Sequence, residues 1–457
     1  MTLQQYLASL RGKQVTVIGI GVSNRPLLRL LVGAGAEVTA RDKKTEDQLG
    51  DIAPQLKEWG VRLALGERYM EDISGDVVFR TPGLRPDHPG LLAAKERGAE
   101  ITSEMEVFFE VCPCPMIAVT GSDGKTTTTS VIAEMLRAAG KTVWLGGNIG
   151  TPLLDQADKM EADHVAVLEL SSFQLMSMKK TPQVAVITNL SPNHLDWHRD
   201  FEEYVEAKCN IFKNQGKDDI LVLNFDNPPS CALAEKAPGQ VRFFSRKSIP
   251  VVGGVWLKNS LLLDNGEPIM AAADIRIPGD HNVENYMAAC AALKGLVEPE
   301  IMAKVAREFN GVEHRLELTR ELDGVKYYND SIASSPSRTL AGLKCFPAEK
   351  IILIAGGYDK HIPFDQLGAA LPTAVRVLLL CGATADKIEA AVKAAPDYAP
   401  GKPELVRFDN LDDTVAYAHK IAKTGDLVLL SPACASFDQF PNFMARGRYF
   451  KELVNKL

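Results

Sequence analysis

The sequence predicts a doubly wound α/β protein of roughly three domains. Short apolar runs recur along the chain with helical stretches between them, as at Met116–Thr120, Val165–Leu170 and Ile351–Ala355. Continuous rather than alternating apolar strands are typical of parallel sheets that helices cover on both faces. The length of 457 residues corresponds to roughly three domains of about 150 residues each.

The other expected strands follow the same pattern in chain order: Val15–Ile20, Val77–Phe79, Val184–Thr188, Ile220–Leu223, Val377–Cys381 and Leu427–Ser431. Residues 241–278 differ, because their turn signals, such as Asn265-Gly266, predict a small extra β-sheet of hairpins. A fresh strand–loop–helix unit follows Glu104–Pro115, and Phe309-Asn310-Gly311 forms a second joint before Glu313-His314-Arg315. We therefore expect domains at 1–103, 104–310 and 311–457.

Composition narrows the class of protein. Lys and Arg number 51 against 58 Asp and Glu, a net charge of −7, which argues against a dedicated binder of nucleic acid or anionic membranes. No apolar run reaches the roughly 18 residues of a membrane span, and the N-terminus lacks a secretory h-region. The eight cysteines are scattered and form no CxxC pair. Free thiols in a reducing cytoplasm are the expectation.

The strongest local motif joins the strand Met116–Thr120 to a helix. A loop of this kind places backbone N–H groups and a helix N-terminus against phosphate, with the lysine on the β/γ-phosphates and the next hydroxyl on Mg²⁺. The strict GxxxxGK[ST] pattern fails because Val119 stands at the first glycine, and a glycine turn capping a helix is the alternative. The residues concerned are Gly121, Ser122, Asp123, Gly124, Lys125, Thr126 and Thr127.

Other candidates follow predicted strands, where parallel sheets hold their ligands. Glu169 ends one strand, and its local context fits a Mg²⁺ ligand or a solvated carboxylate equally. His194 and Asp196 follow the next strand, although a lone histidine is more often structural. Lys208 looks like an ordinary surface lysine.

The two outer segments carry weaker signals. Gly19-Ile20-Gly21 and Asp42 resemble a dinucleotide fingerprint, but Asn24 replaces its third glycine, so the pattern indicates a nucleotide phosphate rather than NAD. Thr81-Pro82-Gly83 looks like a simple turn. In the last segment, three loops could line one crevice: 329–331, 355–360 and 431–438.

Taken together, the motifs resemble the Mur ligases, ATP-dependent amide ligases of peptidoglycan precursor synthesis, over essentially the whole chain. They are GSDGKTTTT, GGNIGTP, LELSSFQL, NHLD, AKCNIF, GDHNVEN, HR, YNDSIASSP, GGYDK and LLSPACASFDQF. The resemblance implies a Rossmann-like UDP-substrate-binding domain, a P-loop ATPase-like central domain and a Rossmann-like C-terminal domain that binds the amino acid. It also implies a cytoplasmic monomer that acts in cell-wall growth, cell shape and cell division.

Within the family, LELSSFQL and SPACASFDQF resemble the member that adds D-glutamate to UDP-N-acetylmuramoyl-L-alanine. Three alternatives stay open. One is a Mur ligase with another acceptor. Another is a folylpolyglutamate synthetase-like ligase, which should lack the UDP site of the first domain. The third is a P-loop nucleotide-switch protein that makes no amide bond.

The resemblance also assigns roles to residues. It implies ATP and two Mg²⁺ ions, with Lys125, Glu169, His194 and Lys208 as catalytic residues. Thr126, Glu169, His194 and Lys208 are the expected metal ligands, Lys208 as a carbamate. The ATP base and ribose are expected at Asn282, Asn285, Arg315 and Asp330.

The substrate contacts come from the same resemblance. UDP-N-acetylmuramoyl-L-alanine is expected at Val22, Ser23, Asp42, Lys43, Gly83, Asn148 and His194. D-Glutamate is expected at Ser334, Lys360, Ser436, Phe437 and Phe443. The chain departs from the family at Ile332, where a lysine is common, and more mildly at Ser334, where threonine is common. Any charge contact of that lysine is absent or supplied elsewhere.

Overall fold

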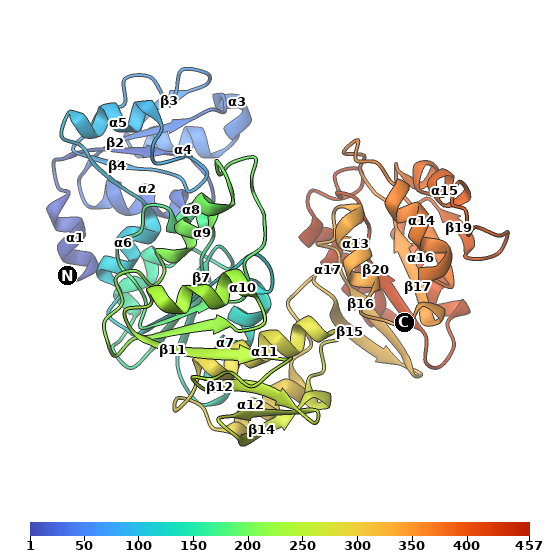
Figure 1. The fold of residues 1–457 in the computed structure, drawn as a ribbon. Helices are drawn as coiled ribbons and strands as arrows, with labels where there is room; N and C mark the ends of the chain where they lie inside the picture. Colours follow the sequence, from blue (N-terminus) through green and yellow to red (C-terminus); the bar gives the residue numbers. More distant parts are fainter. The chain divides into compact units, whose positions relative to one another are not determined.

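The computed structural model describes residues 1–457 and contains three sheets, which confirms the predicted α/β class (Figure 1). One sheet lies in each of the three predicted segments, although the exact domain boundaries stay a prediction. All nine strands predicted from apolar runs are present to within two residues at either end.

The first sheet has the strand order β3-β2-β1-β4-β5, with every pair parallel. Helices cover both faces, because Val77 and Phe79 of β4 belong to a core shared with α2, whereas Val78 packs in a second core with Leu91 of α5. The elements are α1 (Leu3–Ser9), β1 (Gln14–Ile18), α2 (Asn24–Gly33), β2 (Glu37–Asp42), α3 (Glu46–Leu49), α4 (Ile52–Glu58), β3 (Arg62–Leu65), β4 (Val77–Phe79), α5 (Pro89–Glu96), β5 (Glu100–Thr102) and α6 (Glu104–Val111).

The second sheet has nine strands in the order β14-β13-β12-β11-β10-β9-β6-β8-β7. The strands are β6 (Met116–Thr120), β7 (Val143–Gly147), β8 (Val165–Glu169), β9 (Val184–Ile187), β10 (Ile220–Asn224), β11 (Gln240–Ser245), β12 (Gly254–Lys258), β13 (Leu261–Asp264) and β14 (Glu267–Ala271). The expected antiparallel hairpins are present as β12–β14. They do not form a separate sheet, because β12 pairs in parallel with β11 and so extends the central one.

The helices of this region connect the strands. They are α7 (Lys125–Ala138), η1 (Leu154–Lys159), α8 (Ser172–Leu175), α9 (Phe201–Cys209), α10 (Pro228–Cys231), η2 (Ala232–Lys236), η3 (Ala272–Asp274), α11 (Asp280–Ala292) and α12 (Pro299–Glu308). No helix is both long and apolar enough to cross a membrane.

The third sheet has the order β15-β16-β20-β17-β18-β19, and only β15 is antiparallel to its neighbour. Alternate residues of β17 belong to two hydrophobic cores. Leu353 shares one core with α14 and α15, and Ile354 shares the other with α16 and α17. Helices therefore cover both faces of this sheet (Figure 1). The elements are β15 (Glu317–Leu322), β16 (Val325–Asn329), α13 (Pro336–Leu343), η4 (Ala348–Lys350), β17 (Ile351–Ala355), α14 (Asp365–Ala374), β18 (Val377–Cys381), α15 (Ala385–Lys393), β19 (Glu404–Phe408), α16 (Leu411–Ile421), β20 (Leu427–Leu430) and α17 (Phe443–Lys456).

These sheets belong to two compact units. Unit 1 comprises Met1–Ala272 with Glu284–Val305, and unit 2 comprises Ala273–Val283 with Ala306–Leu457. The first two sheets share unit 1 because one continuous core joins them, from α2 through α6 to β6.

Glu104, at the start of α6, predicts a pH dependence of stability. Burial raises the pKa of this carboxyl from 4.5 to about 7, while its Oε1 accepts a hydrogen bond from the Leu154 amide at 3.2 Å. The pKa of this carboxyl is higher in the folded state than in the unfolded state. Its contribution to stability is therefore fully present below the unfolded-state pKa, and it is lost as the pH rises through the folded-state pKa. Relative to Glu104→Gln, the wild-type free energy of unfolding should fall by up to about 3 kcal/mol between pH 4.5 and 7.

Urea unfolding at a series of pH values measures this difference. Glu100→Gln, at an exposed position four residues earlier, serves as the matched control. Parallel pH profiles for wild type and Glu104→Gln would show that Glu104 contributes nothing.

Candidate active site

The loop between β6 and α7 has the geometry of an anion site. Gly121 and Gly124 have φ values of +144° and +78°, a region that disfavours other residues. A Cβ at Gly121 would overlap the Thr188 hydroxyl, and one at Gly124 would overlap the Asn285 side chain. The glycines therefore let the loop lie against its neighbours while the α7 N-terminus, at Lys125, presents its N–H groups and dipole.

Hard oxygen donors converge beside this loop. The Thr126 hydroxyl donates to Glu169 Oε2 at 2.7 Å, and the Asn148 amide donates to Glu169 Oε1 at 2.7 Å. Glu169 is buried as the last residue of β8, the neighbour of β6 in the sheet. The structure thus brings Thr126, Asn148 and Glu169 together, and a hydroxyl with a carboxylate is a donor set that suits Mg²⁺.

Lys208 reaches the same loop and is buried, in contrast to the surface position that its local sequence suggests. Its Nζ donates to the Thr120 hydroxyl at 3.1 Å and to the Gly121 carbonyl at 2.9 Å, and lies 4.7 Å from the Tyr204 ring centroid. Burial, with a smaller effect of Lys125, lowers the pKa of Lys208 well below its usual range. A neutral buried amine is the form that reacts with CO₂, so the environment fits the carbamate that the resemblance implies.

The loop after β9 carries His194, whose φ of +55° lies in the left-handed region. Its ring contacts Phe173 with the centroids 5.0 Å apart. Burial lowers the pKa of His194, Asp196 opposes this effect, and the charges of Lys125 and Lys208 reinforce it. His194 therefore interacts electrostatically with both lysines. A low pKa keeps the imidazole neutral, the state in which it binds a metal.

Of the four residues predicted for the base and ribose of ATP, only Asn285 lies in unit 1. Its Oδ1 accepts a hydrogen bond from the Thr128 hydroxyl at 3.2 Å, beside Gly124. The loop between β6 and α7 is tied to the residues directly after β9, because the Thr188 hydroxyl donates to the Asp123 carbonyl at 2.6 Å and Asp123 N donates to Asn189 Oδ1 at 3.0 Å.

The residues predicted to bind the uridine nucleotide lie at the carboxyl ends of the strands of the first sheet. Asp42 accepts from the amides of Ile20 at 2.7 Å and Lys44 at 2.9 Å, which ties the loops after β1 and β2 together. Val22, Ser23 and Lys43 belong to these two loops, and Val22 is exposed. Gly83 belongs to the loop after β4, and its carbonyl accepts from Trp197 Nε1 at 3.0 Å.

Asn24 explains how the first loop works without a third glycine. Its buried amide donates to the carbonyls of Ile18 at 3.2 Å and Gly19 at 2.8 Å. The side chain therefore fixes the turn that a glycine-rich fingerprint forms with backbone alone.

In unit 2, Asp330 is buried at the end of β16 and accepts from Ser431 Oγ at 2.8 Å and the Leu316 amide at 3.3 Å. Burial raises its pKa to about 7, while the charges of Arg315 and Arg338 oppose the rise. These two arginines provide cationic charge near the segment in which Ile332 replaces the family lysine. Asn282 also lies in unit 2, where its amide donates to the Pro278 carbonyl at 2.6 Å.

The predicted amino-acid residues come from three neighbouring segments of unit 2. Tyr358 pairs with Ala435 and its ring contacts Phe437, so the loops of Lys360 and of Ser436 lie together. Phe437 is 62% exposed, whereas Ser436 is buried with no hydrogen-bond partner for its hydroxyl. Phe443 begins α17 and its carbonyl accepts from Ser331 at 2.8 Å, three residues before Ser334.

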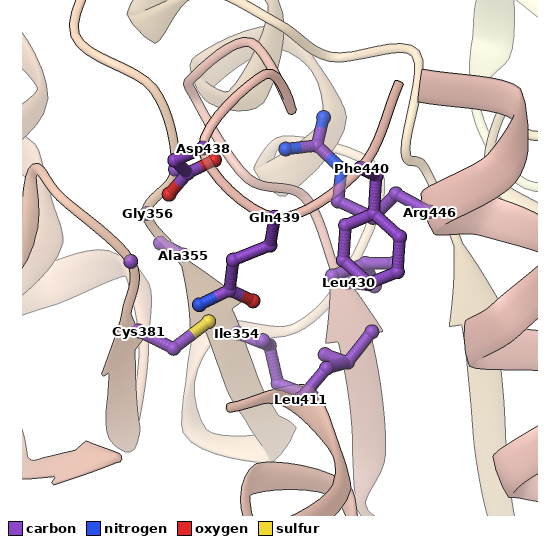
Figure 2. Close-up of a pocket in the computed structure, with 12 residues that line it drawn as sticks. Ile354, Ala355, Gly356, Cys381, Leu411, Leu430, Asp438, Gln439, Phe440 and Arg446 are labelled. Carbon is purple, nitrogen blue, oxygen red and sulfur yellow. The ribbon is translucent and has the colours of Figure 1, made fainter. Parts of the chain in front are cut away.

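Arg446 joins these segments and was not predicted from the sequence. It is buried and donates to Ser331 Oγ and O and to the carbonyls of Cys434 and Ala435, at 3.0 to 3.1 Å. It also lines a pocket with Gly356, Cys381 and Asp438 at the carboxyl ends of β17 and β18 (Figure 2). No local sequence signal distinguishes this arginine from Arg448, two residues later.

Two family models match the chain and cover most of it. The Mur ligase middle domain matches residues 119–293, and the Mur ligase glutamate ligase domain matches residues 314–434. The chain belongs to the Mur ligase family. The predicted enzyme class is therefore confirmed: it is an ATP-dependent, amide-forming ligase.

Curated relatives match over the full length. The UDP-N-acetylmuramoylalanine--D-glutamate ligase of Acetivibrio thermocellus is 50% identical over 100% of this Mur ligase and 99% of its own chain. The enzyme of the same name from Clostridium novyi is also 50% identical over 100% and 99%.

Solved structures agree on the fold. The UDP-N-acetylmuramate-alanine ligase MurC of Thermotoga maritima has a TM-score of 0.57 at 19% identity, and the match covers 97% of this chain and 99% of that one. A pseudomurein peptide ligase type C of Methanothermus fervidus has a TM-score of 0.51 at 18% identity, covering 97% and 100%.

Proposed function

We propose that this Mur ligase joins D-glutamate to UDP-N-acetylmuramoyl-L-alanine, with ATP, in peptidoglycan precursor synthesis. The observation that carries the proposal is the full-length identity of 50% to relatives that bear the name UDP-N-acetylmuramoylalanine--D-glutamate ligase. We further propose that it works as a cytoplasmic monomer.

The reaction has two steps. The alanyl carboxylate attacks the γ-phosphate of ATP and releases ADP, which leaves an acyl phosphate. The amine of D-glutamate then attacks the acyl carbon, and the tetrahedral intermediate collapses to the amide and phosphate. Both steps bring anions together, so the site must stabilise negative charge at the reacting phosphoryl and carbonyl groups.

The phosphate loop and Lys125 are proposed to bind the ATP phosphates. The Lys125 ammonium already lies against the loop, with Nζ donating to the carbonyls of Gly121 at 3.0 Å and Ser122 at 2.9 Å. Asn282, Asn285, Arg315 and Asp330 are proposed for the base and ribose. Lys360 supplies a cation for a substrate carboxylate, beside Ser334, Ser436, Phe437 and Phe443.

Two Mg²⁺ ions would be held by Thr126, Glu169, His194 and a carbamylated Lys208. When bound, the metal ions neutralise phosphate charge during transfer. Carbamylation forms a bond between Lys208 Nζ and the carbon of CO₂ and releases one proton, which converts a buried amine into an anionic oxygen ligand. The oxygen and neutral imidazole donors described above fit such a site.

An acceptor screen tests the proposal. Phosphate release should require both UDP-N-acetylmuramoyl-L-alanine and D-glutamate, and L-glutamate should not replace the D-isomer. Activity with L-alanine, a diamino acid or a folate instead would assign a different Mur or folylpolyglutamate synthetase-like ligase. Nucleotide binding without any amide product would favour a nucleotide switch.

A further inference from the structure

The loop after β4 and the loop after β9 are held together by one arginine. Arg85 donates to both oxygens of Glu203, at 2.9 and 2.8 Å, and to both oxygens of Asp87, at 2.8 and 2.9 Å. Its fifth N–H donates to the Trp197 carbonyl at 2.9 Å. All five guanidinium donors are therefore used, which is the full capacity of the side chain.

Trp197 completes the connection in the other direction. Its indole N–H donates to the Gly83 carbonyl at 3.0 Å, and the Arg85 guanidinium lies 5.0 Å from its ring centroid. The loop after β4 therefore binds the backbone of Trp197 through Arg85, and the Trp197 side chain binds the backbone of the same loop at Gly83. We call Arg85, Asp87, Trp197 and Glu203 the Arg85 cluster.

The turn that this cluster restrains is the one that carries His194. The amides of Trp197 and His198 donate to the His194 carbonyl at 3.1 and 2.9 Å, which closes the turn. The left-handed φ of His194 is an unfavourable conformation for a residue other than glycine, so surrounding contacts must maintain it. The Phe173 ring packs edge-on against His194 and at a tilt against Trp197, with ring centroids 5.0 and 4.6 Å apart.

The charges of the cluster favour a permanent contact. Hydrogen bonds from Arg85 hold the pKa of Glu203 at about 2 and the pKa of Asp87 at about 2, so both carboxylates are ionised near neutral pH. Arg85 is only 21% exposed and Glu203 18%. Partial burial with bidentate geometry makes such pairs stronger than ordinary surface ion pairs.

We propose that Arg85 is a positioning residue, which holds His194 for metal binding and links that site to the loop of Gly83. This inference rests on the proposed function, because it takes His194 as a metal ligand and Gly83 as a UDP contact. Arg85 touches neither ligand itself and acts through the Trp197 backbone. Residues that orient a metal ligand in this way typically affect metal affinity or activity about 10- to 100-fold.

The experiment compares Arg85→Ala with Arg199→Ala. Arg199 is a matched control, because it also binds Asp87 and Glu203 but is 70% exposed and has no hydrogen bond to Trp197. Mn²⁺ binding is measured by electron paramagnetic resonance in the presence of a non-hydrolysable ATP analogue, and turnover is measured over a range of Mg²⁺ concentrations. Arg85→Ala should bind Mn²⁺ at least about tenfold more weakly, with activity partly restored by high Mg²⁺, whereas Arg199→Ala should match wild type.

Arg85→Lys keeps the charge between the two carboxylates and guards against loss of the fold. Lysine has three donors and no planar guanidinium, so it cannot donate to Asp87, Glu203 and the Trp197 carbonyl together. The Mn²⁺ affinity of the Arg85→Lys variant should therefore also fall. Wild-type Mn²⁺ affinity in folded Arg85→Ala or Arg85→Lys would overturn the inference. If the wild-type enzyme did not ligate D-glutamate, the proposed function would be wrong. The Mn²⁺ measurement would still decide whether Arg85 positions a metal ligand.

Discussion

Lys125→Ala should lose turnover by on the order of 10³-fold while keeping its fold. Removing one charge-stabilising donor from a reacting group typically costs about 10²- to 10³-fold in kcat, and the lysine ammonium stands at the N-terminus of α7, where the phosphates are proposed to bind. The side chain is not part of the hydrophobic core, so the melting temperature should change little. Phosphate release and ATP affinity measure the effect.

Lys141→Ala provides the control for Lys125→Ala. It removes an exposed lysine just beyond the end of the same helix, with the same change in net charge. Its kcat should equal that of wild type. A near-normal kcat in Lys125→Ala would contradict the proposed role of the phosphate loop.

Lys208→Ala should also abolish most turnover, and here the fold is expected to survive for a different reason. Lys208 is a buried ionisable group whose ammonium form is disfavoured by burial, so its removal relieves an electrostatic cost that offsets the cost of the cavity it leaves. Urea unfolding should therefore show little loss of stability, and the loss of activity reflects the missing anionic ligand. Lys217→Ala, at an exposed position, is the control.

The modification itself can be observed. After equilibration with ¹³C-bicarbonate, the wild-type protein should show a carbamate carbon signal that is absent from Lys208→Ala. A fully active wild-type enzyme without that signal at saturating bicarbonate would refute carbamylation and leave Lys208 as an amine.

At Lys208 the tertiary structure differs from what the neighbouring residues indicate. Its local sequence, EEYVEAKCNIF, resembles a surface helix, and only the family resemblance marked the lysine as unusual. Its burial arises because α9 packs so that Lys208 Nζ reaches Thr120 and Gly121, which lie 88 and 87 residues earlier. Contacts across such a separation leave no periodic trace in the residues around them.

The same reason explains the other differences. The hairpin strands were recognisable from turn signals, but their attachment to β11 depends on backbone pairing across the sheet. Arg446 and Arg85 look like surface arginines in the sequence, and each gains its role from partners more than 100 residues away, such as Ser331 for Arg446 and Glu203 for Arg85.

The sequence by itself determined the α/β class, the parallel strands and the glycine-containing loop between β6 and α7, because each depends on apolar periodicity or on residues adjacent in the chain. The tertiary structure decided which groups are buried, which carboxylates and lysines share an electrostatic environment, and how the loops of His194 and Gly83 are connected. Burial and charge interactions depend on distance in space, and the chain sets those distances only after it has folded.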